Sequence, residues 1–531
     1  MTVSAAKTGA AEAGPDPYDQ TPYESFPYDF SEPQRLNAIG RLFGMAPPAV
    51  ETCRVLELGC AGGGNILPLA ARYPGARFVG VDRSAVHIAH AQALADAVDA
   101  RNAVFRRVSI TDIGADFGTF DYIVCHGVLS WVPAPVRESI FRVIGQCLSP
   151  QGIALVSYNT LPGWHQARAI RDMLLYHTAR FAAPEEKVAQ GMALLRFVLD
   201  AIPAALASYR EIVQSEINLL ATQRTSYMLH DHMEDENQAF YLHEVAALAR
   251  ASGLDYLGDT ALEVMYAQNF PEPVAKVLAT ADDAVRTEQY MDFIANRRFR
   301  TSLFCRRGVS LRRNVDSARI VDFHIGSRLS PVDPGSFDLT VDRAEKFTTP
   351  NGIEVSTANR YATALFVEIA GLAGRVESAQ SLIRDAARHL PNDATAADRI
   401  KSELVSIGLR LVFTGVLSLH SEASTHAAAV SARPVAFPVA REVAKKNDWA
   451  PSLNHRRVNL GVGERVLLVA CDGTRDLAQL RGVVADAVGR GELNLSVDGG
   501  PAPDSVRAGR AIEEWVGNVL ANLAGAGLLV G

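Results

Sequence analysis

Cysteine is scarce in this sequence, and its cysteines are never closely spaced. Six cysteines occur among 531 residues, and no two of them stand in a Cys-x-x-Cys spacing. Zinc ribbons and disulfide-stapled folds need such closely placed cysteines, so both classes are excluded as the organising principle of the chain. Isolated thiols are typical of a reducing compartment, and we therefore expect a cytoplasmic protein.

Long apolar runs and an excess of basic charge are also missing. No stretch approaches the roughly 20 apolar residues that cross a bilayer, so no membrane span is predicted. Residues 1–17 contain a single lysine and no apolar segment like that of a signal peptide, and we expect a disordered tail there. A formal net charge of -7 argues against a chain-wide nucleic-acid surface, and no nucleic-acid partner is predicted.

The sequence does contain a strand, a glycine-rich turn and a helix in immediate succession. The apolar run Val55–Leu58 predicts a buried strand, and the apolar residues of Ile66–Ala70 predict a helix. Between them lies GCAGGGN, residues 59–65, whose glycines would let a ligand approach the backbone amides. Glycines alone are equally compatible with a plain tight turn. The next strand, residues 78–82, ends in the carboxylate of Asp82, as a ribose diol requires, and this favours a nucleotide site.

The charge of the turn indicates which nucleotide it binds. Glu57 precedes the first glycine by two residues, and no Lys or Arg occurs between Val55 and Ala71. A pyrophosphate would find no compensating cation there, and Ala61 stands where a dinucleotide turn favours a second glycine. S-Adenosylmethionine carries a positive ammonium and a positive sulfonium, so an acidic turn favours it over NAD.

Strands and helices continue to alternate beyond this unit and predict a doubly wound α/β sheet, with ligands at the carboxyl ends of its strands. The third strand leads to Asp112 and Ile113, where the carboxylate could bind the adenine amine or simply cap a helix. The fourth strand leads to His126 and Gly127. Two antiparallel strands, predicted at 254–257 and 300–306, would close the sheet, with helical insertions at about 182–240 and 262–298.

Three side chains near the predicted crevice are candidates for catalysis: Tyr158, His126 and Trp131. Tyr158 and His126 could orient a lysine amine, and Tyr158 or Trp131 could hold a cation against an aromatic face. The alternative for Trp131 is a core residue beneath the loops. In the aromatic stretch 18–30, Tyr23 is a candidate to close over the cofactor, with simple packing against the domain as the alternative.

The stretch His230–Glu236, HDHMEDE, contains several side chains that can bind a metal. Its spacing would scatter them around a helix, whereas ligands at i and i+4 share a face, so no metal site is predicted. The preferred interpretation is a solvated face, or an acidic lip that attracts a basic substrate such as lysine.

The chain beyond Leu311 has the character of separate folding units. Pro350-Asn351-Gly352 is a hairpin signal, and helices are predicted at about 376–390 and 396–419. The last hundred residues resemble a winged helix without marked basic character, so a protein contact or a packing role is expected. The predicted division is a tail at 1–17, a donor-binding core with its N-terminal arm at 18–181, a helical insertion with the sheet-closing strands at 182–308, a middle α+β region at 309–425 and a winged-helix-like domain at 432–531.

A set of stretches within residues 18–308 is similar to one known family: TPYESFPYDF, LELGCAGGGN, FDYIVCHGVLSWVP, VSYNTLPGW, HDHMEDENQAFYLHE, LDYLGDTA and DFIANRRFRTSLFCRRG. They resemble bacterial class I methyltransferases with a methyltransferase regulatory domain, a group that includes lysine methyltransferases of outer-membrane proteins. The resemblance implies a Rossmann-like sheet with helical insertions, S-adenosylmethionine as cofactor and a homodimer. Ala61 departs from the family, whose turn usually has glycine there.

The resemblance also implies roles for individual residues. The methionine moiety would be surrounded by Glu57, Gly59, Gly63, Gly64 and Asn65, with Cys60 in the same turn. Asp82 would take the ribose hydroxyls, Asp112 with Ile113 the adenine edge, and His126 with Gly127 the region near the sulfonium.

We therefore predict an S-adenosylmethionine-dependent methyltransferase that acts on lysine side chains of a protein, with a cell-envelope protein as the candidate substrate. A lysine amine has an unperturbed pKa of about 10.4, so the site must desolvate it, supply a base or release its proton to water. One alternative is a small-molecule O- or N-methyltransferase, which a closed cavity would favour over an open trough. Another is a non-catalytic protein that binds the cofactor or a partner.

Overall fold

The computed structural model describes residues 24–222, 228–229, 232–234, 236–281, 283–333, 335, 337–425, 427, 429–493, 496–497, 500–501 and 505–530. The predicted tail and Tyr23 lie outside the described residues, as do His230, Asp231 and Asp235 of the acidic stretch.

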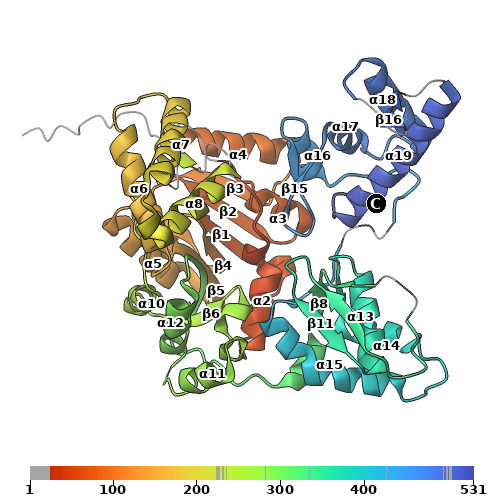
Figure 1. The fold of residues 1–531 in the computed structure, drawn as a ribbon, viewed down its shortest axis with the longest axis horizontal. Helices are drawn as coiled ribbons and strands as arrows, with labels where there is room; N and C mark the ends of the chain where they lie inside the picture. Colours follow the sequence, from red (N-terminus) through yellow and green to blue (C-terminus); the bar gives the residue numbers. More distant parts are fainter. Residues whose placement is uncertain are drawn as a thin grey trace, which may run out of the picture.

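Seven strands of the N-terminal half form one sheet in the order β3-β2-β1-β4-β5-β7-β6 (Figure 1). Neighbouring strands are parallel from β3 to β5, and β7 runs antiparallel to both β5 and β6. This order confirms the predicted class I methyltransferase sheet and its two closing strands. The strands are β1 (Arg54–Leu58), β2 (Arg77–Asp82), β3 (Ala103–Arg107), β4 (Phe120–Cys125), β5 (Leu148–Asn159), β6 (Leu254–Asp259) and β7 (Phe299–Arg306).

The sheet is buried on both faces, as its continuous apolar runs require. Successive side chains of β4 belong to different core clusters: Tyr122 and Val124 pack on one face, and Ile123 and Cys125 on the other. The helices of this half include α2 (Pro33–Leu42), α3 (Ile66–Arg72), α4 (Ala85–Ala97), α5 (Ala134–Cys147), α10 (Leu242–Ala251), α11 (Glu272–Leu278) and α12 (Ala284–Ala295).

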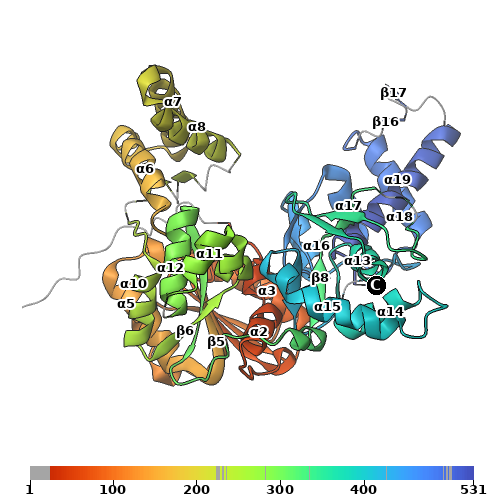
Figure 2. The same ribbon diagram turned by 60° about the horizontal axis from the view of Figure 1, so that its bottom comes forward.

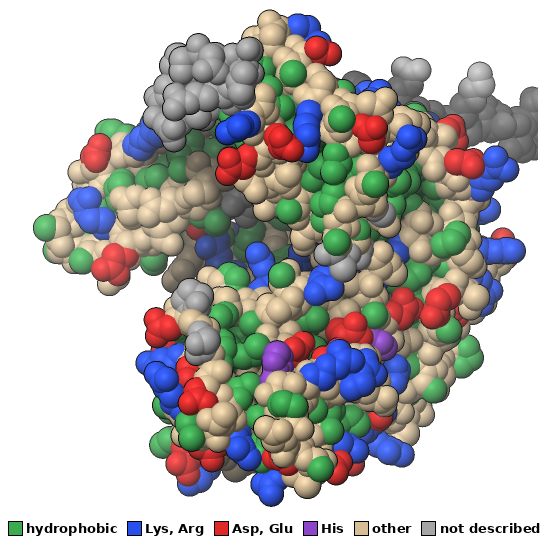
Figure 3. Space-filling view, turned by 90° about the vertical axis from the view of Figure 1, so that its right-hand side faces the viewer, with side chains coloured by type: hydrophobic (Ala, Val, Ile, Leu, Met, Phe, Trp, Pro, Cys, Tyr) green, Lys and Arg blue, Asp and Glu red, His purple; other side chains and the backbone are tan. Residues whose placement is uncertain are grey.

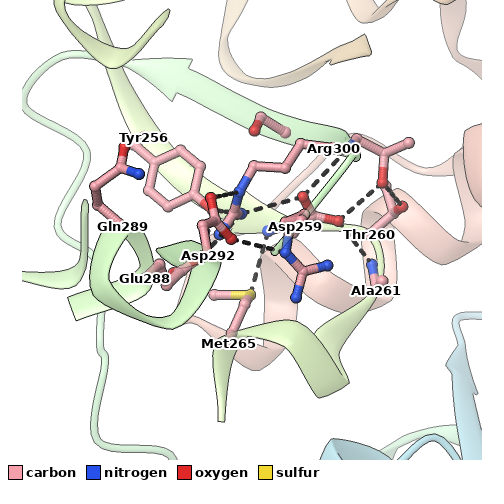
Figure 4. Close-up of polar contacts among 12 residues, drawn as sticks. Tyr256, Asp259, Thr260, Ala261, Met265, Glu288, Gln289, Asp292 and Arg300 are labelled. Atoms are coloured by element: carbon pink, nitrogen blue, oxygen red, sulfur yellow. Dashed lines mark hydrogen bonds and ion pairs between the residues drawn. The ribbon is translucent and has the colours of Figure 1, made fainter. Parts of the chain in front are cut away.

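A buried ion-pair cluster joins β6, β7 and α12 (Figure 4). The Arg300 guanidinium lies 2.7 Å from a carboxylate oxygen of Asp292, 3.1 Å from one of Glu288 and 3.3 Å from one of Asp259. Arg297 forms a second ion pair with Asp292 at 2.7 Å. Buried charges need such pairing, so these carboxylates depend on Arg300.

The insertion after β5 forms a helical lobe that stands away from the sheet (Figure 2). It consists of α6 (Trp164–Thr178), α7 (Pro184–Ala201) and α8 (Ala207–Ala221), and it has its own apolar core, which includes Ile170, Leu195 and Val213. Among the described helices, no single one is long and apolar enough to cross a membrane. The segments 184–201 and 204–221 reach that length and composition only together, with a bend of 114° between them.

The middle region is built on a small sheet of order β12-β8-β13, which consists of β12 (Val376–Ser378), β8 (His324–Ser327) and β13 (Leu417–His420). The predicted hairpin forms from β10 (Glu345–Thr348) and β11 (Glu354–Thr357). The two predicted helices are shorter than expected, because the residues at 376–378 and 417–420 pair with β8. The helices are α13 (Arg360–Gly371), α14 (Ala379–Ala387) and α15 (Ala396–Phe413).

The C-terminal region combines helices with two short antiparallel strand pairs, the architecture of a winged helix. Its elements are α16 (Pro438–Ala444), β14 (Trp449–Pro451), β15 (Arg457–Asn459), α17 (Val462–Ala470), α18 (Leu477–Gly489), β16 (Ser496–Val497), β17 (Gly500–Pro501) and α19 (Ser505–Gly525). Helix α16 packs against α3 and α4 of the N-terminal half, so this region lies beside the glycine-rich turn (Figure 1). Figure 3 shows acidic and basic side chains interspersed on the face that the C-terminal half presents.

Candidate active site

The glycine-rich turn joins the carboxyl end of β1 to α3. Gly59 and Ala61 have φ values of +78° and +44°, in the left-handed region. The N–H groups of Gly59 and Cys60 donate to the Val81 carbonyl oxygen at 2.9 and 3.0 Å. The Ala61 N–H donates to the Asp82 carboxylate at 3.0 Å. The end of β2 therefore fixes the conformation of the turn.

A cavity of about 460 Å³ opens between this turn, the strand ends and the N-terminal arm. The carboxyl ends of β1, β2 and β4 meet there, where the fold predicts a ligand. The predicted site residues that line this cavity are Glu57, Gly59, Cys60, Asn65, Asp82, His126, Gly127 and Trp131.

Glu57 gives the cavity its chemical character. It is 4% exposed, and one carboxylate oxygen accepts a hydrogen bond from Asn65 Nδ2 at 2.8 Å. Its other oxygen, Oε2, has no hydrogen-bond partner among the residues that the structure describes. Burial raises the pKa of Glu57 to about 8, against the hydrogen bond from Asn65, which lowers it. A buried carboxylate with an unpartnered oxygen, in a residue that lines a cavity, is suited to receive a cation.

His126 contributes a neutral ring to the cavity wall. Burial lowers its pKa to about 4, so the imidazole carries no charge near neutral pH. Nδ1 forms a hydrogen bond of 2.8 Å with the Ser157 hydroxyl, which also accepts from the Gly127 N–H at 2.8 Å. The ring makes edge contacts with the aromatic rings of Tyr28 and Phe30, at centroid distances of 4.1 and 5.0 Å. This side of the cavity is therefore aromatic and uncharged.

Trp131 both borders the cavity and packs against the core, the two positions considered for it. It lines the cavity, and its ring packs edge-on against the buried Trp164 at 6.4 Å.

The N-terminal arm forms one wall of the cavity through residues such as Ser25, Phe26 and Tyr28. Gly64 donates its N–H to the Ser25 hydroxyl at 2.8 Å, and a Cβ on Gly64 would lie 2.1 Å from the Ser25 carbonyl oxygen. Gly63 instead faces α4, where a Cβ would come within 3.1 Å of that of Ala91. The two glycines therefore allow the arm and α4 to approach the turn.

Tyr158 lies in the protein core, which corrects the expectation that it lines the substrate site. It is 1% exposed, and its hydroxyl forms a hydrogen bond of 2.9 Å with Ser302 of β7. Side chains alternate along a strand, and on β5 it is Ser157 that reaches His126. The neighbouring Tyr158 consequently points to the opposite face of the sheet.

Asp112 and Ile113, which were expected at the adenine edge, are not among the described residues that line the cavity. A 3-10 turn at Ile110–Asp112 leaves Asp112 exposed, where it accepts a hydrogen bond from Thr111 Oγ1 at 3.1 Å. Ile113 is 1% exposed in the core. Ser109 and Ile110 line the cavity at this strand end instead. Because the sequence analysis looked for a carboxylate at this strand end, it did not predict Ser109 and Ile110.

The acidic stretch contributes both to the cavity and to the helical lobe. Glu234 and Glu236 line the cavity, as the acidic-lip interpretation requires. His232 is buried and forms a hydrogen bond of 2.9 Å with Glu216 of α8, which also pairs with Arg298 at 3.1 Å. Within the described part of the chain, no group of three or more His, Cys, Asp or Glu side chains could hold a metal ion.

Comparisons with known proteins agree with this geometry. Three sequence profiles match the chain: "Methyltransferase domain" over residues 56–154, "Predicted methyltransferase regulatory domain" over 224–306 and "PKMT, C-terminal winged helix domain" over 432–528. The uncharacterized protein RP789 of Rickettsia prowazekii is 38% identical over 490 residues, which cover 91% of this chain and 88% of that protein. This chain belongs to the class I methyltransferases with a regulatory domain.

The structure of this methyltransferase is similar over nearly its whole length to a solved one. PKMT2 from Rickettsia typhi, in complex with AdoHcy, shares 29% identity and a TM-score of 0.89 with it, over 96% of this chain and 100% of the other. A second structure of PKMT2 from Rickettsia typhi gives a TM-score of 0.88, again over 96% of this chain and 100% of the other.

S-Adenosylmethionine is the cofactor of this class, and the cavity of this methyltransferase fits it. The fit rests on Glu57, whose buried Oε2 needs a cation or a hydrogen-bond donor that no described residue supplies. When bound, S-adenosylmethionine supplies a methyl group on a positively charged sulfur.

Proposed function

We propose that this methyltransferase transfers methyl groups to lysine side chains of a protein substrate. The Glu57 carboxylate, buried and open to a cation in the cavity, carries the donor side of the proposal. The protein substrate is supported by the winged-helix profile and the solved relative, both of which bear the name PKMT, for protein lysine methyltransferase.

The donor would be held by two carboxylates at neighbouring strand ends. Glu57 receives the ammonium of the methionine moiety, and Asp82 receives the ribose hydroxyls. The Asp82 oxygens each accept one backbone N–H, from Ala61 at 3.0 Å and from Ser84 at 2.9 Å. Each carboxylate oxygen has a second lone pair, so both remain able to accept a hydroxyl hydrogen.

The acceptor amine would enter beside His126 and Tyr28. Deprotonating a lysine with its ordinary pKa of about 10.4 costs about 4.6 kcal/mol at pH 7. The aromatic, uncharged wall formed by these rings desolvates the amine and so lowers that cost. Once the amine has lost a proton to water, its lone pair would be free to form the N–C bond while the C–S bond of the donor breaks, which leaves a methylated ammonium and a neutral thioether. Glu234 and Glu236 attract the cationic lysine before it loses that proton.

The substrate class is best separated from a metabolite by direct labelling. Purified enzyme is incubated with donor labelled in its methyl group, together with cell-envelope proteins in one reaction and a small-molecule extract in another. Label in lysine of the protein fraction is expected, and Asp82→Ala should abolish it. Label confined to the small-molecule fraction would instead identify a metabolite methyltransferase. Label confined to proteins from outside the cell envelope would contradict the cell-envelope assignment.

We also propose a cytoplasmic location for this protein. Fractionation of cells that produce it tests this location.

We also propose that the lobe of α6–α8 joins two copies of the chain. This lobe exposes large apolar side chains, with Tyr176 90% and Phe197 68% exposed. Apolar groups of this size at the surface of a projecting lobe favour burial in a partner. Sedimentation equilibrium should give the mass of a dimer for the wild type and that of a monomer for Phe197→Asp, whereas a monomeric wild type would contradict the proposal.

A further inference from the structure

The hairpin of the winged-helix domain reaches back to the donor site. Between β14 and β15 the chain turns at His455, which is 1% exposed and has a φ of +55°. The imidazole Nε2 of His455 lies 2.7 Å from Asn65 Oδ1, across 390 residues of sequence. Asn65 belongs to the glycine-rich turn, so the last domain of the chain contacts the cofactor loop directly.

Asn65 is the centre of a hydrogen-bond network. Its Oδ1 also accepts from the Tyr28 N–H at 3.1 Å and the Ser31 hydroxyl at 3.0 Å. Its Nδ2 donates to Glu57 Oε1 at 2.8 Å. An amide oxygen can only accept, so the proton of His455 lies on Nε2. This hydrogen bond holds the Asn65 side chain in the orientation that presents its NH₂ group to Glu57.

The residues around His455 also contact the N-terminal arm. The Arg456 side chain pairs with Asp29 at 2.8 Å, and the Arg457 guanidinium lies 4.5 Å from the centroid of the Phe26 ring. Phe26 packs edge-on against Trp449 of β14 at 4.9 Å. The arm that lines the cavity is thus held between the hairpin and the glycine-rich turn.

The environment of His455 is costly to maintain. A non-glycine residue in the left-handed region is strained, and within the described part of the chain the buried Nδ1 of His455 has no hydrogen-bond partner. Burial also lowers the pKa of His455 to about 3, so it contributes a neutral donor rather than a charge. The polar contact that histidine makes at this buried position is the hydrogen bond to Asn65.

We propose that His455 is a positioning residue of the methyl-donor site, which fixes Asn65 and, through it, Glu57 and the arm that lines the cavity. The winged-helix domain then stabilises the cofactor-binding conformation of the glycine-rich turn in the same chain. This inference rests on the proposed donor site at Glu57.

The test compares His455→Gln with His455→Met in the full chain. Glutamine and methionine have nearly the same length and both are unbranched, so they share the backbone strain and differ in the N–H donor. We expect calorimetry to show a donor Kd within about threefold of wild type for His455→Gln and about tenfold higher for His455→Met, since one neutral hydrogen bond is worth about a factor of ten in affinity. The donor KM should follow the Kd, and kcat at saturating donor should stay within about twofold of wild type, as expected for a residue that acts on donor binding. Equal affinities for the two variants would overturn the proposal.

A double-mutant cycle tests whether His455 acts through Asn65. In an Asn65→Ala background, His455→Met should have little further effect on donor Kd, because its partner is gone. Additive losses would mean that His455 acts elsewhere, and the proposal would fall. Glu57→Gln serves as the independent check: unchanged donor affinity in that variant would remove the proposed donor site itself, whatever the His455 variants show.

Discussion

The backbone N–H of Ala61 donates a hydrogen bond of 3.0 Å to the Asp82 carboxylate, which ties the glycine-rich turn to the end of β2. Ala61 makes this contact with a φ of +44°, a conformation that glycine adopts without strain. Because Ala61 is not glycine, the turn keeps this geometry at some cost in stability.

Ala61→Gly should therefore raise the free energy of unfolding. The left-handed conformation costs a non-glycine residue roughly 1–2 kcal/mol, and the greater freedom of an unfolded glycine offsets part of that gain. We expect a net increase of about 0.5–1 kcal/mol in urea unfolding. Gly59→Ala is the matched control, because its Cβ would lie 2.5 Å from Val128 Cγ2, and it should lower stability. A loss of stability in Ala61→Gly would contradict this account of the turn.

Glu57→Gln should alter both the stability of the donor-free protein and the pH dependence of donor binding. Burial raises the pKa of Glu57 from 4.5 to about 8 in the fold. The folded protein therefore holds this proton more tightly than the unfolded chain does. The resulting stability is fully present below about pH 4.5 and is lost as the pH rises to about 8. The variant should escape that loss and be more stable than wild type at pH 8.

Donor affinity of the wild type should show the opposite trend. Binding a cation requires the Glu57 carboxylate, so affinity should rise with pH up to about 8 and then level off. Calorimetry in buffers of different ionisation enthalpy should detect release of one proton on binding below that pH. In Glu57→Gln the affinity should be lower and independent of pH over this range, and a preserved pH profile would show that another group titrates.

Tyr158→Phe should affect stability rather than turnover. The hydroxyl bonds to Ser302 inside the core, so its loss leaves a buried partner and costs about 1 kcal/mol in urea unfolding. Both kcat and donor KM should stay within about twofold of wild type, because the side chain lies away from the cavity. Ser302→Ala should give a similar loss of stability, and a selective fall in kcat for Tyr158→Phe would restore a role for Tyr158 in the reaction.

Arg300→Met should be strongly destabilising. It leaves the buried Asp259, Glu288 and Asp292 without their common cation, and breaking a buried pair costs about 3–5 kcal/mol. Arg300 lowers the pKa of Glu288, so its removal raises that pKa further, and the deficit should shrink as the pH falls. Arg297→Met is the control, since its side chain is 19% exposed and it pairs with Asp292 alone in this cluster. Similar losses in the two variants would mean that burial of the pair does not matter here.

The predicted residues that do line the cavity are those set by local order along the chain. A strand, a turn and a second strand with a terminal acid place Glu57 and Asp82 in one cavity, because parallel strands end at the same edge of the sheet. The placement of Tyr158 depends instead on which side chains of β5 point to each face of the sheet. A shift of one residue along the strand would exchange the two faces. The sequence around residue 158 contains no signal that fixes this choice.

Other residues of the site are harder to predict from the sequence. The chain forms a 3-10 turn at Ile110–Asp112, where Asp112 is exposed and Ser109, just before the turn, lines the cavity. His455 is farther still from any local pattern, because its partner Asn65 lies in a different domain. Contacts of this kind follow from how the folded units dock, which periodicity does not encode.

The contact between His455 and Asn65 also sets an order of events during synthesis. The arm, β1 and the glycine-rich turn leave the ribosome early, and nearly four hundred further residues must follow before His455 is made. A growing chain that has completed its sheet therefore still lacks one of the hydrogen bonds that orient its cofactor loop. The proposed role of His455 therefore implies that a chain ending before residue 455 would bind the methyl donor more weakly than the finished protein.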